Sequence, residues 1–231
     1  MRFAKAIFVM SLMVSSLAIA QSTTNSIYID QVGDNSTITI KQKGQSNKIG
    51  TEQARVILEG NSQTLDITQE GNNNTINGSI EQADNVDYDT TVTGDNNDIV
   101  YDQGGSGSIA GSTKTLTVTG DSNELTFNQG TTSSATGATQ TIAITGDTNT
   151  LTSTINADDV VNTKTIVGSG NVITTVQNGT AGKNIEMLLT GSTNTVTVNQ
   201  QSTTNVDTLK IDSTSSGSTI TINQCNAGGP C

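Results

Sequence analysis

A phrase of alternating apolar and polar residues, closed by a short turn, recurs along almost the whole chain. Its clearest copy runs Val56-x-Leu58-x-Gly60-x-x-Gln63-x-Leu65-x-Ile67-x-Gln69-x-Gly71-x-x-Asn74-x-Ile76. Further along, the Gly-x-x-Asn turn returns at successive intervals of 26, 26, 22 and 23 residues between Gly94 and Gly191. Self-similarity at a period of roughly 20 to 50 residues is typical of solenoids and related arrays. The repeat therefore constrains the fold more than any local propensity does.

Alternation with a period of two, together with many Thr, Val and Ile residues, predicts half-buried β-strands. No stretch after residue 20 keeps a helical period, so we expect no helix there. Each repeat should supply a strand, a tight turn, a second strand and an arc of variable length, because loops tolerate length variation best. Stacking these units predicts an all-β, flattened solenoid with two strands per rung and about eight to nine rungs, roughly 40 Å long.

The composition agrees with such a stack and excludes much chemistry. Hydrophobic residues make up 32% of the chain, aromatic residues 3%, and there is one Pro and no His. Without histidine the chain has no imidazole base and no histidine-ligated zinc or haem. The net charge of −11 argues against nucleic-acid binding, which needs Lys and Arg to replace the phosphate counterions. We therefore expect no enzyme, no cofactor and no nucleic-acid partner.

The first twenty residues have a composition of their own. Arg2 and Lys5 precede an apolar run over residues 6–17, and Ala18-Ile19-Ala20 matches a cleavage site, which predicts a secretory signal peptide. A transmembrane anchor is the alternative, but the run is shorter than the roughly 20 residues that a span needs. The predicted domains are thus a signal peptide (1–20), the repeat domain (21–224) and a C-terminal cysteine loop (225–231). Loss of Arg2 and Lys5 changes the net charge from −11 to −13.

Both cysteines lie at the end of the chain. Cys225 and Cys231 flank the five residues Asn-Ala-Gly-Gly-Pro. In an oxidising compartment, two Cys that close a small turn predict one disulfide within the chain. Pairing between two chains is the alternative.

Amide side chains recur at fixed places in the repeat, and we predict that they form ladders along the stack. A buried amide costs roughly 1 to 3 kcal/mol if unpaired, whereas a repeated one can bond to the copies above and below it. For the Asn residues the alternative is a local role, since Asn tolerates left-handed turns. The predicted ladder residues are Gln31, Gln42, Asn47, Gln69, Asn74, Asn97, Asn123, Gln129, Asn149, Asn171, Asn194, Gln200 and Gln224. The predicted turn glycines are Gly33, Gly44, Gly60, Gly71, Gly94, Gly120, Gly146, Gly168 and Gly191.

Aspartates follow several of these glycines, at Asp34, Asp95, Asp121 and Asp147. Stacked carboxylates could hold Ca²⁺, but Ser169 and Ser192 take this place in later copies. The nonapeptide pattern of calcium-binding β-rolls is also missing. We therefore predict solvent-facing turn residues and no metal site.

The phrase Ile-x-Ile-x-Gln-x-Gly-x-x-Asn-x-Ile-x-Ile-x-Gln resembles the curlin repeat of curli fibre subunits, the secreted functional amyloids of Gram-negative biofilms. The resemblance is close over residues 27–85, and partial from residue 86 onward, where Val118, Ile144 and Leu189 stand in place of the first Gln. Over 27–85 the matching residues are Gln31, Gly33, Gln42, Gly44, Asn47, Gln69, Gly71, Asn74, Gln82 and Asn85. The resemblance implies a β-solenoid subunit that is exported through the outer membrane and polymerises end to end on the cell surface.

Three functions compete at this stage. The first is a structural polymer, because the repeat begins within about seven residues of the predicted mature N-terminus with no capping element before it. Such a fibre would contribute to biofilm matrix and surface adhesion. Its partners would be further copies of the chain, a related nucleator subunit and outer-membrane secretion machinery, without membrane insertion. Bulk subunit, nucleator and terminator remain alternatives for its role.

The second is an ice-binding solenoid that uses outward Thr-x-Thr arrays, although Asp66, Glu124 and Lys210 interrupt the outward positions. The arrays are Thr37/Thr39, Thr115/Thr117/Thr119, Thr195/Thr197 and Thr219/Thr221. The third is a monomeric solenoid adhesin, for which aromatic side chains that stack on sugars are few: Tyr28, Tyr88, Tyr101 and Phe127.

Overall fold

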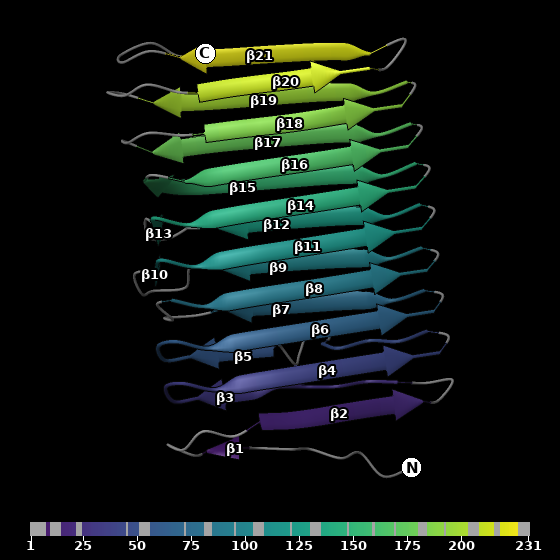
Figure 1. Ribbon diagram of the computed structural model, residues 1–231, viewed down its shortest axis with the longest axis vertical. Helices are drawn as coiled ribbons and strands as arrows, with labels where there is room; N and C mark the ends of the chain where they lie inside the picture. Colours follow the sequence, from purple (N-terminus) through teal and green to yellow (C-terminus); the bar gives the residue numbers. More distant parts are fainter. Residues whose placement is uncertain are drawn as a thin grey trace.

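The computed structural model consists of β-strands joined by short turns and longer arcs, with no helix among the residues it describes. These residues are 8–9, 15–21, 25–44, 46–50, 56–71, 73–80, 85–94, 96–103, 109–120, 122–129, 135–146, 148–158, 160–168, 170–179, 184–191, 193–202, 208–214 and 218–225. Figure 1 shows the strands stacked along the long axis of the molecule in two facing layers.

One layer is a nine-stranded sheet in which every strand pairs in parallel with its copy from the next repeat. In order its strands are β2 (Ser15–Gln21), β4 (Thr37–Lys43), β6 (Thr64–Glu70), β8 (Asp87–Thr93), β11 (Thr113–Thr119), β14 (Thr139–Thr145), β16 (Val161–Val167), β18 (Asn184–Thr190) and β20 (Thr208–Ser213). Most of these strands have seven residues, and inward and outward positions alternate along them as the sequence pattern predicts.

The other layer is a twelve-stranded sheet, also parallel. Along its main path lie β1 (Phe8–Val9), β3 (Asp30–Val32), β5 (Val56–Glu59), β7 (Thr75–Ile80), β9 (Asp98–Gln103), β12 (Glu124–Gln129), β15 (Thr150–Asp158), β17 (Val172–Gly179), β19 (Thr195–Ser202) and β21 (Thr219–Cys225). The short strands β10 (Ile109–Ala110) and β13 (Ala135–Thr136) extend it at the side of the longer arcs (Figure 1).

The predicted all-β, two-sheet parallel solenoid is therefore confirmed. Six turns, from β6 and β7 to β18 and β19, supply a strand of at least six residues to each sheet and have neighbouring turns on both sides. The expected eight to nine rungs is slightly too high as a count of complete turns. The turns at the two ends are incomplete: β5 has only four residues, and among the described residues no rung lies beyond β20 and β21.

The predicted leader overlaps the first strands. β1 and most of β2 lie within residues 1–20, and the β2 backbone pairs with β4 from Ser15 opposite Thr37 to Gln21 opposite Lys43. Removal of the leader stays a prediction. The part of the chain that the structure describes contains no helix with the length and hydropathy of a membrane span.

The core lies between the two sheets. Inward side chains at the same position of successive strands line up along the axis in rows, and each rung contributes one side chain to each row. Ile, Leu and Val fill most places, and residues such as Ile67, Val118 and Leu189 are fully buried. Aromatic side chains fill part of the core over two successive rungs. Tyr88 meets Tyr101 edge to face at 4.5 Å between ring centroids, and Tyr101 meets Phe127 at 5.6 Å. Such pairs contribute beyond the area they bury.

Two lysines also lie inside the core. The Lys114 ammonium lies 4.6 Å from the centroid of the Phe127 ring, a cation–π geometry. Lys164 is fully buried, and its Nζ has no hydrogen-bond partner among the described residues. Burial lowers the pKa of Lys164 to about 7, because a desolvated ammonium is disfavoured. Both lysines stand at inward positions of the alternating strand pattern, although neither was predicted as a core residue from the sequence.

Candidate assembly site

The turn glycines occupy two different arcs of the solenoid. Gly33 and Gly60 lie where the chain passes from the twelve-stranded to the nine-stranded sheet. The other seven lie at the opposite arc, after each strand of the nine-stranded sheet from β4 to β18, and form one column along the axis. From Gly71 onward, each glycine in this column packs on the backbone of the glycine one rung earlier. The arc with this column is the tight one on the right in Figure 1.

Close stacking explains why this column contains glycine. Gly120 has φ 142°, and a Cβ built on it would lie 2.0 Å from the carbonyl oxygen of Gly94. Any other residue would combine an unfavourable backbone conformation with a direct clash against backbone atoms. The requirement comes from neighbouring rungs as much as from the turn itself.

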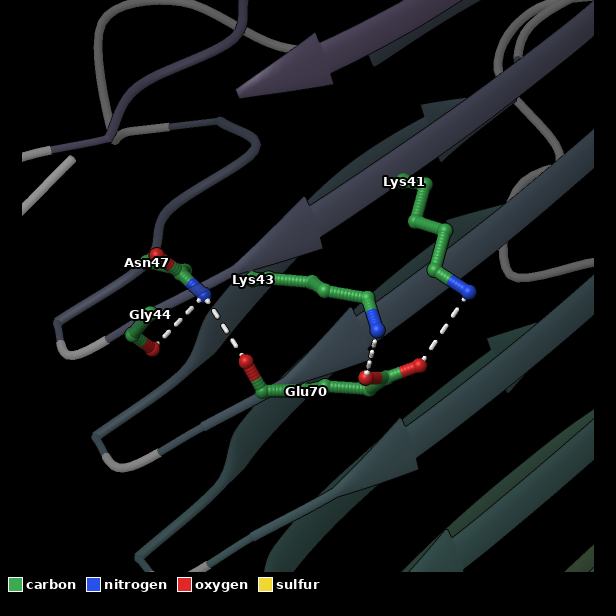
Figure 2. A network of polar contacts seen from close by, with 5 residues as sticks. All are labelled: Lys41, Lys43, Gly44, Asn47 and Glu70. Carbon is green, nitrogen blue, oxygen red and sulfur yellow. Dashed lines mark hydrogen bonds and ion pairs between the residues drawn. The ribbon is translucent and has the colours of Figure 1, made fainter. Parts of the chain in front are cut away.

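The asparagine column closes these same turns. Each Asn is buried, and its side-chain amide donates to the carbonyl oxygen of the glycine three residues earlier, as Figure 2 shows for Asn47 and Gly44. The seven donor–acceptor distances, for Asn47, Asn74, Asn97, Asn123, Asn149, Asn171 and Asn194, are 2.9, 2.6, 2.8, 2.9, 3.2, 3.3 and 3.2 Å. These bonds give the carbonyl oxygen of each of these glycines a side-chain donor.

Left-handed backbone occurs one residue before each of these asparagines. Ser46, Asn73, Asn96, Ser122, Thr148, Gly170 and Thr193 have φ between 55° and 71°. Axial bonds also join some members of the column. Asn25 donates to Asn47 at 2.5 Å, and Asn97 donates to Asn123 at a long 3.4 Å. The structure thus brings the predicted asparagines into one column, and their shortest bonds lie mostly within each turn.

The predicted glutamines fall into two columns on different sheets. Gln42 and Gln69 are buried at the ends of β4 and β6, and Gln69 Nε2 donates to Gln42 Oε1 at 2.8 Å. Gln129 and Gln200 are buried at corresponding positions of the twelve-stranded sheet, and Gln224 occupies the same column in the uncovered last strand. Gln31 donates to the Ser36 hydroxyl at 2.7 Å.

Three amides outside the predicted set take part in the same kind of contact. Asn162 donates to Gln177 at 2.9 Å, and Gln177 donates to Gln200 at 2.8 Å, so a short ladder crosses from one sheet to the other and up the axis. Gln63 donates to the carbonyl oxygens of Gly33 and Glu59 at 2.9 and 2.6 Å, which makes it the counterpart of the turn asparagines on the other arc. Its place after Gly60, at Gly-x-x-Gln, is the sequence signal for that role.

Replacing a turn asparagine tests what this column contributes. For Asn123→Leu and Asn149→Leu we expect each change to cost about 1 to 3 kcal/mol, because a buried glycine carbonyl loses its side-chain donor, and to slow or disorder assembly. Urea unfolding and fibre-growth kinetics measure the two effects. Asn128→Leu, at a half-buried outward position of β12, is the control and should change little. Equal losses in all three variants would contradict a role for the turn bond.

The C-terminal end of the solenoid leaves core residues uncovered. At the C-terminal end, Ile220 and Ile222 of β21 are 41% and 43% exposed, whereas Val196 and Val198 one rung earlier are fully buried. At the N-terminal side, Ile27 and Ile29 are only partly buried. An unpaired parallel strand edge with apolar residues invites another strand.

The outward positions of β11, β14 and β16 form a surface that we call the threonine face. It carries no charged residue, and it continues onto β8 at Thr91 and Thr93. Its threonines are Thr91, Thr93, Thr113, Thr115, Thr117, Thr119, Thr139, Thr141, Thr145, Thr163 and Thr165. The charges that interrupt the sequence pattern lie outside this face: Asp66 on β6, Lys210 on β20, and Glu124 on the other sheet.

Charged side chains occupy the outward positions towards both ends. Lys41 and Lys43 both reach Glu70 on the next strand, at 3.2 and 2.7 Å (Figure 2), and these contacts lower the pKa of Glu70. Lys210 bonds Glu186 at 2.6 Å. Asp89 lies among like charges, and burial together with Asp66 and Asp87 raises its pKa. Pairs this exposed contribute little to stability but set which strands fit beside each other.

The remaining predicted positions fall partly outside the described residues. Asp34 accepts a hydrogen bond from the Asn61 backbone at 2.7 Å, whereas Asp95, Asp121 and Asp147 lie outside the described part of the chain. Cys225 ends β21, but its side chain and Cys231 are outside it too, so their pairing stays a prediction. Among the described residues no three His, Cys, Asp or Glu side chains are placed to hold a metal ion.

The geometry defines a class: a parallel two-sheet β-solenoid with stacked Gly-x-x-Asn turns and an uncovered last rung. Comparison with family models, with curated proteins and with solved structures found no match to this chain.

Proposed function

We propose that the chain is a secreted structural subunit of an extracellular, curli-like amyloid fibre on a Gram-negative bacterium, which grows by stacking solenoid rungs. The observation that carries this proposal is the last rung, where Ile220 and Ile222 lie uncovered on a strand whose outer edge pairs with no other described strand. A solenoid that acts alone covers such an edge, because it exposes both apolar area and unpaired backbone groups.

Other features support a polymer. Each rung packs on the next through parallel backbone pairing, amide contacts and apolar side chains. A second copy added to the last rung would extend these same interactions. The resemblance to curlin repeats over residues 27–85 agrees with this role and adds the biofilm matrix, a nucleator subunit and outer-membrane secretion machinery as the setting. The negative surface would keep neighbouring fibres apart.

Fibre formation by purified protein that begins at Gln21 tests the proposal. We expect thioflavin-binding fibres with a meridional diffraction spacing of about 4.7 to 4.8 Å along the fibre axis. Electron microscopy with and without reductant then shows whether Cys225 and Cys231 matter for assembly. A protein that stays monomeric at high concentration, with no such spacing, would overturn the proposal.

The threonine face favours ice binding as a second candidate function. Its threonines lie in register on neighbouring strands, for example Thr115 beside Thr141 and Thr141 beside Thr163. The spacing is therefore about 4.8 Å between strands and about 6.6 Å along them. A regular, uncharged array of methyl and hydroxyl groups on aligned strands could order water in a lattice-like pattern, and Figure 1 shows these strands nearly parallel.

Thermal hysteresis of the monomer measures this second function. If the face binds ice, Thr141→Lys at its centre should remove most of the hysteresis, because a long hydrated charge breaks the array. Thr39→Lys, at an outward position of β4 outside the face, should leave it unchanged. Absence of hysteresis in the unaltered protein would rule the function out.

A further inference from the structure

We propose that the outer edge of β20 is a binding site for one parallel β-strand, supplied by a partner polypeptide of the same repeat type. The strand is seven residues long, as β2 and β4 are, and carries apolar residues at its second and fourth positions. The site exists in a single copy of the chain. In the proposed fibre the same strand fills a gap between stacked copies, and that part of the inference rests on the proposed function.

The order of the strands shows why a next copy does not cover this edge. After the predicted cleavage, the first described strand position is that of residues 25–32, in the twelve-stranded sheet, and the last described strand, β21, belongs to the same sheet. If residues 25–32 of a next copy add to β21, its β4 lies about 9.6 Å from β20, which is two strand spacings. One strand of the nine-stranded sheet is missing between them.

The uncut chain shows which element occupies this place. There β2 lies parallel to β4, from Ser15 opposite Thr37 to Gln21 opposite Lys43. An extended strand therefore completes the sheet at this position. The cleavage predicted after Ala20 removes almost all of it and leaves the edge of β4 without its neighbour.

Backbone groups of β20 point towards its outer edge. Thr214 donates its N–H to the carbonyl oxygen of Leu189 in β18, at 3.0 Å. Because successive residues of a strand direct their backbone groups to opposite sides, Leu209 and Ile211 direct theirs away from β18. Among the described residues, no strand pairs with this side of β20. An added parallel strand would bond to these groups, as every strand of this sheet bonds to the next.

The same strand would lie over the exposed side chains of the last rung. Ile220 and Ile222 share columns with the buried Val196 and Val198, so they face the core side of β21. Strands of the nine-stranded sheet contact the strand that precedes them in the other sheet. On β7, for example, a Cβ built on Gly78 would lie 3.9 Å from the hydroxyl of Tyr88 in β8. A strand that follows β21 in this way would cover the two isoleucines.

Neighbouring side chains select the sequence of the added strand. Its positions are counted from the residue beside Thr208, so the second and fourth lie beside Leu209 and Ile211, where apolar side chains are favoured. The third lies beside Lys210, where a carboxylate is favoured. In the gap between copies the seventh position also lies beside Lys43 of the next copy, which favours an acidic residue there.

The sequence of β6, Thr-Leu-Asp-Ile-Thr-Gln-Glu, has all of these features. Its last residue, Glu70, already pairs with Lys43 at 2.7 Å within the chain. The sequence of β2, Ser-Ser-Leu-Ala-Ile-Ala-Gln, has Ser and Ala at the second and fourth positions, which are small beside Leu and Ile. A strand of the β6 type therefore fits this site better than the leader strand of another copy.

Disulfide trapping with a synthetic strand tests the site. The chain that begins at Gln21 is made with Cys225→Ser, Cys231→Ser and Asp212→Cys, and is oxidised with the peptide Thr-Leu-Asp-Ile-Cys-Gln-Glu. In the proposed register the two Cα atoms lie about 4.8 Å apart, within the range of roughly 4.4 to 6.8 Å that a disulfide spans. We expect a one-to-one adduct as the main product, identified by mass spectrometry.

Three further peptides test register and sequence. With Cys at the third position instead of the fifth, the peptide should link to Lys210→Cys and hardly to Asp212→Cys, from which it lies about 8 Å. A peptide with Lys at the second and fourth positions should link to Asp212→Cys at least about tenfold less, because it would bury two charges. The β2 sequence with Cys at its fifth position should also link less. If it linked as well as the β6 sequence, the leader strand of an uncut copy would be the occupant and the proposed partner would be wrong.

The outcomes separate this site from the fibre function. No adduct, or equal linking by all the peptides, would overturn the strand site and leave the fibre function standing. An adduct from a protein that forms no fibres would support the site and overturn the fibre function. Fibres grown from the unaltered chain with excess β6 peptide should retain one peptide per subunit after washing. Fibres that retain none would overturn the gap between copies.

Discussion

Gly146→Ala is expected to lower the free energy of unfolding by at least about 3 kcal/mol, a large loss for the addition of one methyl group. Gly146 has φ 144°, and an added Cβ would lie 2.1 Å from the carbonyl oxygen of Gly120 and 2.8 Å from its carbonyl carbon. These are backbone atoms of the neighbouring rung, so the clash is relieved only by separating two rungs. The loss is measured by urea unfolding followed by circular dichroism.

Gly137→Ala is the matched control. Gly137 also has a positive φ, 66°, but a Cβ on it would meet nothing within 4 Å. The change should therefore cost only the left-handed backbone penalty, about 1 to 2 kcal/mol. If both variants lost the same stability, the stacking of glycines from rung to rung would not be what requires Gly146.

Stability is expected to rise with pH from about 7 towards 10, because of Lys164. The pKa of this lysine is about 7 in the folded chain and near its ordinary 10.5 when unfolded. Between these values the unfolded chain binds a proton that the folded chain does not, so raising the pH favours folding, and below about pH 7 this contribution stays at its minimum. Over the whole window the effect is on the order of 3 to 5 kcal/mol.

The surroundings of Lys164 explain the direction. Its register neighbours in the nine-stranded sheet are Ile142 and Met187, and the facing column contains Thr175, so no carboxylate balances an ammonium there. The pairing of Thr90 with Tyr101 at 2.9 Å shows that these two columns meet across the core. Burial also raises the pKa of Tyr88, which lowers stability once unfolded tyrosines ionise near pH 10, so the measurement ends at about pH 9.5.

Thermal unfolding of Lys164→Met between pH 6 and 9.5 tests this expectation. The variant should lose the rise with pH and be more stable than the parent at pH 7, since methionine fills the volume without a charge. Lys210→Met is the control, because Lys210 is exposed and pairs with Glu186 at the surface. A parent protein whose stability does not change between pH 7 and 9.5 would contradict a buried lysine with a lowered pKa.

Several properties follow from the sequence alone, because they depend on local periodicity. A period of two along each strand and a period near 24 along the chain are sufficient to predict parallel strands stacked in two sheets. The glycine of each Gly-x-x-Asn turn and the asparagine that follows it are visible for the same reason, since a turn is a contact between residues three apart. The role of Gln63 has the same local signal, with Gln in place of Asn.

Only the tertiary structure decided which of the repeated residues lie on the same sheet and contact one another. Gln42 and Gln129 are alike in sequence but lie on different sheets, and Gly60 lies on the opposite arc from Gly71. The core positions of Lys114 and Lys164 and the uncharged threonine face depend on the register between strands 22 to 27 residues apart in the chain. That register depends on the length and path of the arc that joins one strand to the next. The arcs differ in length and sequence, so the register cannot be predicted from a sequence period. The repeat thus specifies the strands and turns of a single rung. The packing of one rung on the next specifies which side chains line up in the core and on the outer faces.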